Sequence, residues 1–74
     1  MDLNLYLDSE NSLSAAELAR QIDASPAFIY QWQRNLRPVP VRYCVAIERA
    51  TAGAVTRKDL RPDDWQMYWP ELPA

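Results

Sequence analysis

Residues 14–33 carry the signals for two short helices joined by a tight turn, and no other segment constrains the fold as strongly. Ser14 and Glu17 stand at the spacing of a capping box, in which each side chain hydrogen-bonds the backbone amide of the other residue. Ser25 followed by Pro26 signals a second helix start, because a hydroxyl caps the free amides and proline has no amide to lose at the first helical position. The two signals predict helices that begin after Ser14 and after Ser25.

Apolar side chains recur at helical spacing in both predicted helices and give each one an inward face. The inward residues are Leu18, Ala19, Ile22, Ile29 and Trp32. Asp23 stands at the turn, where it tolerates the left-handed backbone conformation better than most residues. A small residue, a turn and these apolar anchors are what two steeply crossing helices require, so residues 14–34 predict a helix-turn-helix. The second helix of that motif usually lies in the major groove of DNA.

The outward face of the second helix predicts which side chains contact DNA. Gln31 can hydrogen-bond an adenine edge at two atoms, and Ala27 can pack against a thymine methyl group. Tyr30 can contact a phosphate or a base edge. Phe28 shares this face, but it can equally cover the core or a dimer contact, and those alternatives stay open.

Phosphate contacts are expected at the ends of the two helices. The second helix is expected to end at Asn35 or Arg37, ahead of a proline-rich loop. Arg34 and Arg37 are therefore placed for the DNA backbone rather than for the bases. Ser25 and Ser14 stand at helix starts, where exposed amides and the helix dipole favour an anion. Ser25 is a helix cap in either case, so a phosphate contact is only one of its two expected roles.

The charge of the chain is acidic overall and basic in the middle. Ten acidic and eight basic side chains give a net charge of −2, whereas DNA-binding domains are usually basic. Residues 24–62, however, hold seven basic side chains against two acidic ones, a local net charge of +5. The basic residues of this stretch are Arg34, Arg37, Arg42, Arg49, Arg57, Lys58 and Arg61. A phosphate backbone responds to the face presented to it, so the basic middle favours DNA binding while the overall acidity weakens non-specific binding.

Composition excludes several other classes of function. The chain has no histidine, one cysteine and one glycine, which excludes zinc fingers and glycine-rich nucleotide-binding loops. A helical domain of this size without histidine has little room for a catalytic pocket, so no catalytic residue, metal or cofactor is expected. The single Cys44 fits a buried thiol in a reducing compartment. No apolar run approaches the ~18 residues of a membrane span, so we expect a soluble, cytoplasmic protein without membrane contact.

The rest of the chain predicts further short helices. Residues 1–8 fit either a strand or a helix, and we favour a helix because a lone strand has no evident pairing partner. A helix over residues 40–50 follows the stiff loop 37–40, and Gly53 supplies the left-handed residue that ends it. Residues 56–59 repeat the capping-box pattern and predict one more short helix.

The chain ends in a segment, residues 63–74, that is both acidic and aromatic. Its large apolar residues are Trp65, Met67, Tyr68 and Trp69. Each aromatic ring carries roughly 150–250 Å² of surface, so burying this segment contributes much more to stability than leaving it in water. Either the tail folds back to complete the core, or it forms a surface for a partner, and both alternatives stay open.

Six segments together point to one known family. They are ELARQI (17–22), SPAFIYQW (25–32), RPVP (37–40), AIERATAGAV (46–55), RPDDW (61–65) and WPEL (69–72). On these motifs, which cover nearly the whole chain, the sequence resembles the Cro-like, YdaS-type helix-turn-helix proteins of bacterial prophages, a family described as antitoxins. It departs from the common pattern at Asp23, where glycine is usual, and at the bulky Phe28 and Tyr30.

The resemblance implies a compact, all-α, lambda-repressor/Cro-like domain of four or five helices over residues 1–74. It also implies a sequence-specific transcriptional repressor, encoded by a bacterium or a phage, that controls a prophage or toxin–antitoxin operon. Such a protein binds double-stranded DNA at a palindromic operator as a homodimer. The alternative function is a protein-binding antitoxin or adaptor module that engages a toxin or another protein through the aromatic tail, residues 63–74.

Overall fold

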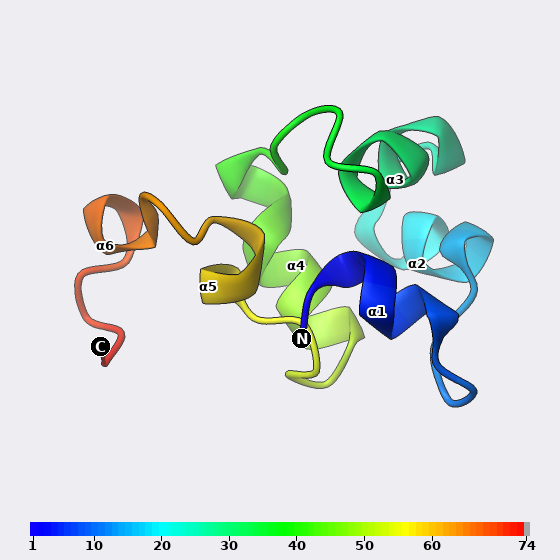
Figure 1. The fold of residues 1–74 in the computed structure, drawn as a ribbon, viewed down its shortest axis with the longest axis horizontal. Helices are drawn as coiled ribbons and strands as arrows, with labels where there is room; N and C mark the ends of the chain where they lie inside the picture. The colour runs from blue at the N-terminus through cyan, green and yellow to red at the C-terminus, as the bar shows by residue number, and fades with distance from the viewer. Residues whose placement is uncertain (74) are drawn as a thin grey trace.

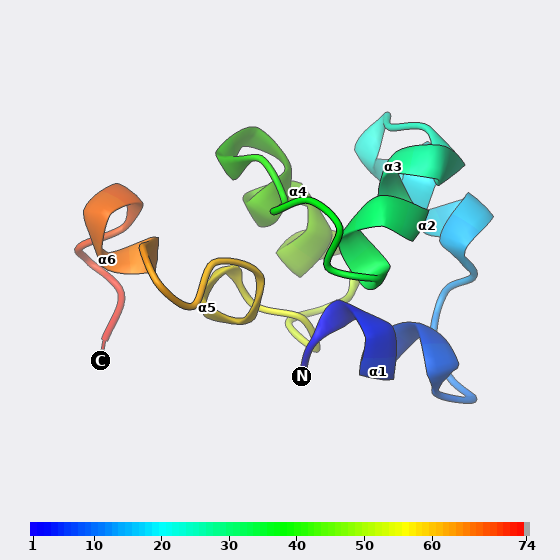
Figure 2. The same ribbon diagram turned by 45° about the horizontal axis from the view of Figure 1, so that its top comes forward.

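The computed structural model describes residues 1–73, and these residues form six helices without a strand. The helices are α1 (Leu3–Asp8), α2 (Ala15–Ile22), α3 (Pro26–Gln33), α4 (Val41–Ala50), α5 (Arg57–Leu60) and α6 (Trp65–Tyr68). Figures 1 and 2 show α1, α2 and α3 on one side of the central α4, with α5 and α6 on the other. The all-helical fold class is confirmed, and so is the choice of a helix near the start of the chain. The single turn α6 is one helix more than expected.

Side chains cap the two helices of the predicted motif. The Ser14 and Ser25 hydroxyls accept hydrogen bonds from the backbone amides of Glu17 and Phe28, at 3.1 and 3.4 Å. The capping box at Ser14 is only half formed, which corrects the prediction. The Glu17 carboxylate turns away from the helix start and pairs with Arg20, which lies almost one turn further along the exposed side of α2.

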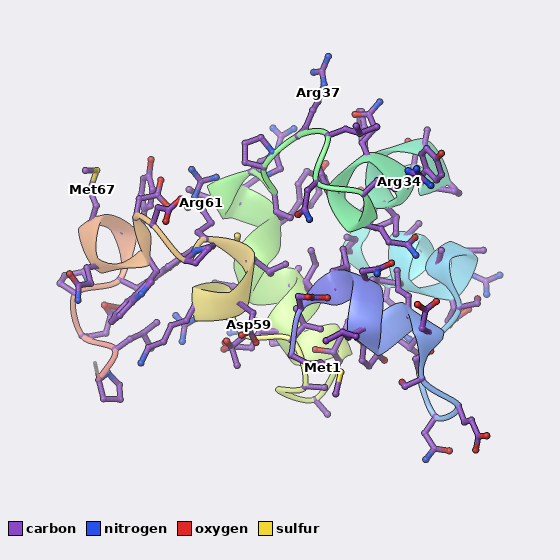
Figure 3. All side chains as sticks on the ribbon, viewed as in Figure 1. Met1, Arg34, Arg37, Asp59, Arg61 and Met67 are labelled. Carbon is purple, nitrogen blue, oxygen red and sulfur yellow. The ribbon has the colours of Figure 1, made fainter. Side chains whose placement is uncertain are left out.

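The second predicted capping box, at the start of α5, is complete. The Asp59 amide donates to the Thr56 hydroxyl at 3.1 Å, and the Thr56 amide donates to the Asp59 carboxylate at 2.9 Å. The same carboxylate accepts a hydrogen bond from the Met1 amine at 3.0 Å, which links the start of the chain to α5 (Figure 3). Burial acts to raise the pKa of Asp59, but these hydrogen bonds and the ammonium charge outweigh it and hold the pKa below its ordinary value.

Three helices, α2, α3 and α4, are each followed by a residue other than glycine in the left-handed conformation. Asp23, Asn35 and Ala52 have φ angles of 59°, 58° and 54°. In each case the next amide donates to the carbonyl five residues earlier, at 2.8–2.9 Å, which is the Schellman pattern. Asp23 makes the predicted turn, and Asn35 rather than Arg37 closes α3. Gly53 is left-handed as predicted, but Ala52 enters that region one residue earlier, at a cost of about 1 kcal/mol relative to glycine.

The core lies where α2, α3 and α4 meet. Its completely buried large side chains are Leu18, Ile29, Cys44, Ile47 and Val55. Trp32 is buried as well, and its ring centroid lies 5.2 Å from that of Tyr43 on α4. All five residues predicted to face inward from α2 and α3 are buried. The core therefore braces α3 from one side.

Cys44 is a structural thiol in this core. Its Sγ lies 3.5 Å from the carbonyl oxygen of Pro40, on the preceding turn of the chain. Burial raises the pKa of the thiol to about 11. A thiol with that pKa stays protonated at neutral pH and is a poor nucleophile, and its burial agrees with the prediction of a buried thiol.

The aromatic tail divides between the core and the surface. Trp69 is only 8% exposed and belongs to the core, whereas Met67 is 77% exposed and points away from the molecule in Figure 3. Trp65 is half-buried, with the Lys58 ammonium 4.5 Å from its ring centroid. Tyr68 is exposed. The tail thus completes the core through Trp69 and leaves Met67 and Tyr68 at the surface, while Ala74, the last residue of the predicted tail, lies outside the described residues.

Arg61 fastens the tail to the loop between α3 and α4. Its guanidinium donates to the two carboxylate oxygens of Asp64 at 2.9 and 2.7 Å, and to the carbonyl oxygen of Val39 at 2.7 Å. The hydrogen bonds from Arg61 lower the pKa of Asp64. This arginine is committed to holding the structure together, even though the sequence placed it in the basic stretch.

Candidate nucleic-acid interface

One side of α3 faces solvent along the length of the helix. The predicted contact residues Ser25, Ala27, Phe28, Tyr30 and Arg34 are all exposed on it. Ile29 and Trp32 face the other way, into the core. The aromatic tail does not cover this surface, because α6 lies on the far side of α4 in both ribbon views (Figures 1 and 2). The outer face of α3 is therefore open to a large ligand.

Gln31 differs from the other residues of this face because its side chain is half-buried. Its amide oxygen, Oε1, is covered and has no hydrogen-bond partner within residues 1–73. The sequence predicted a freely exposed amide, so the structure corrects that expectation. A buried acceptor without a partner costs about 1–3 kcal/mol. An outside donor, such as the amino group of a base, can remove this cost only if the Gln31 side chain turns to expose the oxygen.

The two predicted phosphate sites at helix starts are accessible. Ser14 and Ser25 are exposed, and each hydroxyl already accepts a backbone hydrogen bond as an N-cap. Each hydroxyl keeps its own proton to donate to a phosphate oxygen. The remaining free amides of the first turn point in the same direction, as the positive end of a helix dipole requires.

Ion pairs with carboxylates neutralise the positive charge of several arginines. Arg57 pairs with Glu48 at 3.3 Å and Arg61 with Asp64 at 2.7 Å, and Arg20 on α2 is paired as well. The arginines without a carboxylate partner within residues 1–73 are Arg34, Arg37, Arg42 and Arg49. Arg34 directly follows α3, Arg37 lies in the loop between α3 and α4, and Arg42 belongs to the first turn of α4. The unpaired positive charge therefore gathers beside α3.

A groove of about 490 Å³ lies at the surface between α3 and the start of α4. It is lined by Phe28, Gln31, Trp32, Arg37, Pro38, Pro40, Arg42 and Tyr43. Aromatic rings supply much of this lining, two arginines contribute to it and no carboxylate does. The Arg42 guanidinium lies over the Tyr43 ring, 5.0 Å from the ring centroid. An apolar surface with positive charges at its edges is thus continuous with the outer face of α3.

The structure divides the predicted site residues into two groups. Phe28, Gln31 and Arg37 share the groove, and Figure 3 shows Arg37 projecting from the loop between α3 and α4. Arg34 instead lies 5.4 Å from the ring centroid of Tyr30 and lines a separate pocket beside α1. Sequence analysis counted Arg42 only as part of the basic stretch. Its place beside α3 depends on how α4 packs, which no local motif reports.

Two other kinds of site are absent from the described part of the chain. Residues 1–73 contain no group of three or more histidine, cysteine, aspartate or glutamate side chains arranged to hold a metal ion. Among the same residues, none of the helices has both the length and the apolar character that a membrane crossing requires.

Two comparisons with known proteins bear on this chain. A family described as "Bacterial toxin YdaS" matches residues 11–68, a range that includes α2 to α6. A protein of Escherichia coli (strain K12) named "Putative transcriptional regulator YdaS" is 47% identical over 49 residues. That match covers 65% of this chain and 50% of the relative, so the chain spans about half the length of that relative. The family description names a toxin, where the sequence resemblance suggested antitoxins.

Proposed function

The chain belongs to the bacterial toxin YdaS family, and we propose that it is a sequence-specific, DNA-binding transcriptional repressor of a prophage or toxin–antitoxin operon. The observation that carries the proposal is the pair α2 and α3, whose second helix is braced by the core and exposed on its outer side. The name of the Escherichia coli relative supports the coarser role of a transcriptional regulator. The protein then acts in the bacterial cytoplasm, where its DNA target lies.

In this proposal α3 lies in the major groove and its outer face meets the base edges. Gln31 bonds an adenine after its side chain turns to expose the amide oxygen, which then finds the donor that it lacks within residues 1–73. Ala27 packs against a thymine methyl group, and Tyr30 and Phe28 lie on either side of it in the major groove of the DNA. These four residues carry the sequence preference.

Four further residues position the protein on the phosphates in this proposal. They are Arg34, Arg37, Ser25 and Ser14, all exposed. The net charge of −2 does not prevent this contact, because Arg34 and Arg37 have no carboxylate partner within residues 1–73. A DNA strand responds to that local face.

Selection from random duplex DNA tests the proposal directly. We expect repeated rounds of binding and amplification to enrich one inverted repeat, since a symmetric pair of recognition helices reads a palindrome. A pool that stays random after selection, with binding no tighter to any fragment than to the starting mixture, contradicts sequence-specific repression.

Replacing Arg34 with alanine is expected to weaken binding to all DNA sequences alike. Arg34 has no carboxylate partner within residues 1–73, so its charge is free to displace a counterion from a phosphate. Losing one such contact lowers the slope of log affinity against log salt by about 0.9. Fluorescence anisotropy over a range of salt concentrations measures that slope, and an unchanged slope rules out the phosphate contact.

Two copies of the protein are expected on one operator. A single helix-turn-helix covers only a half-site, so adequate affinity requires a dimer. Sedimentation should show a dimer at micromolar concentration, or two copies on a duplex that carries both half-sites. A duplex with a single half-site serves as the control and should hold one copy. A monomer on the full operator contradicts the homodimer.

A second candidate function, a protein-binding antitoxin or adaptor module, is favoured by the exposed end of the tail. Met67 and Tyr68 lie at the surface of α6, on the far side of α4 from α3. A toxin or another protein can bind there without touching the candidate DNA surface. The double variant Met67→Ser with Tyr68→Ser separates the two functions, because it should keep DNA affinity and lose only the protein partner.

A further inference from the structure

We propose that the groove between α3 and α4 holds the sugar–phosphate backbone of one DNA strand, with Arg37 and Arg42 binding a phosphate from its two sides. The inference rests on the proposed function and extends its contact surface beyond the helix-turn-helix to α4. Arg42 is the residue that it adds. The motif itself ends before α4, and nothing in the pattern of residues 14–34 includes this side chain.

The shape and lining of the groove suit a sugar–phosphate unit. Its volume of about 490 Å³ lies in the range of sites that hold small ligands. Phe28 stacks on Trp32 with ring centroids 6.1 Å apart, and Trp32 lies 5.2 Å from Tyr43. The three rings therefore form one continuous apolar surface from α3 to α4. Such a surface fits the carbon face of a deoxyribose ring.

The charges of the groove suit the phosphate. Arg37 comes from the loop after α3, and Arg42 comes from the first turn of α4. Neither arginine has a carboxylate partner within residues 1–73, and no carboxylate lines the groove. Arg42 lies over the Tyr43 ring, which restricts its side chain. Two guanidinium groups without counterions favour an anion that both can hydrogen-bond.

The position of the groove favours a nucleic acid over an acidic peptide. Phe28 and Gln31 belong both to the groove and to the face that α3 presents to solvent. When α3 lies in the major groove of DNA, the sugar–phosphate backbone passes along the side of α3, next to the bases that α3 contacts. The groove occupies that side. An acidic peptide could pair with the same arginines, but its binding site would have no reason to lie next to α3.

The test compares Arg42→Gln with Arg49→Gln. Arg49 lies two turns later on α4, about 10 Å along the helix axis, and is also exposed without a carboxylate partner within residues 1–73. Anisotropy titrations use the selected operator and a scrambled duplex of equal length. We expect Arg42→Gln to weaken both about fivefold at 0.15 M salt and to lower the salt slope by about 0.9. Arg49→Gln should match the parent protein.

A second measurement locates the phosphate. Operators that carry one neutral methylphosphonate each are titrated with the parent protein and with Arg42→Gln. We expect one position at which neutralisation weakens the parent and has no further effect on the variant. If Arg42→Gln binds every duplex as the parent does, the proposal is wrong, and so it is if only the binding of an acidic peptide changes. If the parent binds neither duplex, the proposed function itself fails.

Discussion

Replacing Trp69 with alanine is expected to lower the free energy of unfolding by about 3–5 kcal/mol, the usual cost of truncating a buried aromatic residue. A chain of this length has a total stability of only about 4–11 kcal/mol, so the variant loses much of its folded population. The expectation follows from the burial of Trp69, which is only 8% exposed and packs into the core although it lies near the end of the chain. Urea unfolding followed by circular dichroism measures the loss.

Met67→Ala is the matched control for that experiment. Met67 lies two residues before Trp69, in the same short segment, but its side chain is 77% exposed. Its truncation should change the stability by no more than about 0.5 kcal/mol. If Trp69→Ala is as stable as Met67→Ala, Trp69 does not belong to the core, and its ring becomes available to a partner.

Replacing Gln31 with alanine is expected to weaken operator binding by about 1–3 kcal/mol, which corresponds to roughly 5- to 150-fold. Binding to a scrambled duplex should hardly change, because the contact is to a base edge and not to a phosphate. The fold should tolerate the substitution well. The Gln31 amide oxygen is covered and unpartnered within residues 1–73, so alanine removes a costly group rather than a stabilising hydrogen bond.

Gln33→Ala is the control for Gln31→Ala, since it removes the same side chain from the same helix. The Gln33 amide donates to the Asn4 side chain at 3.1 Å, on the side of α3 that faces α1. Its loss should therefore leave operator affinity unchanged. Anisotropy titrations of both variants on the selected operator measure the difference. Equal affinity of Gln31→Ala and the parent protein excludes Gln31 as a base contact.

The local elements of the fold were predictable from short stretches of residues. Ser14 and Ser25 cap the helices that follow them, and Asp23 makes the turn between them. Each of these signals depends on residues at most five positions apart, so the chemistry that decides them is visible in the sequence. The exception is Glu17, which pairs with Arg20 and leaves its capping box half formed.

The candidate site was predictable only in part. The outward positions of Ala27, Phe28 and Tyr30 follow from helical periodicity once Ile29 and Trp32 face the core. The covered oxygen of Gln31 does not follow from periodicity, and neither does the groove beside it. Both depend on how closely the start of α4 and its preceding loop approach α3, which is a matter of packing between elements.

The sequence by itself determined α1 to α5, the N-caps Ser14, Ser25 and Thr56, and the face that α3 turns away from the core, because all of these rest on contacts within a turn or two of chain. Only the tertiary structure decided which charges remain for a ligand. Arg57 meets Glu48 from nine residues away, and Arg61 reaches the Val39 carbonyl from 22 residues away. The contact with Glu48 neutralises Arg57, whereas Arg34, Arg37 and Arg42 keep no carboxylate partner within residues 1–73. Composition alone cannot show that distribution, because it counts charges without placing them.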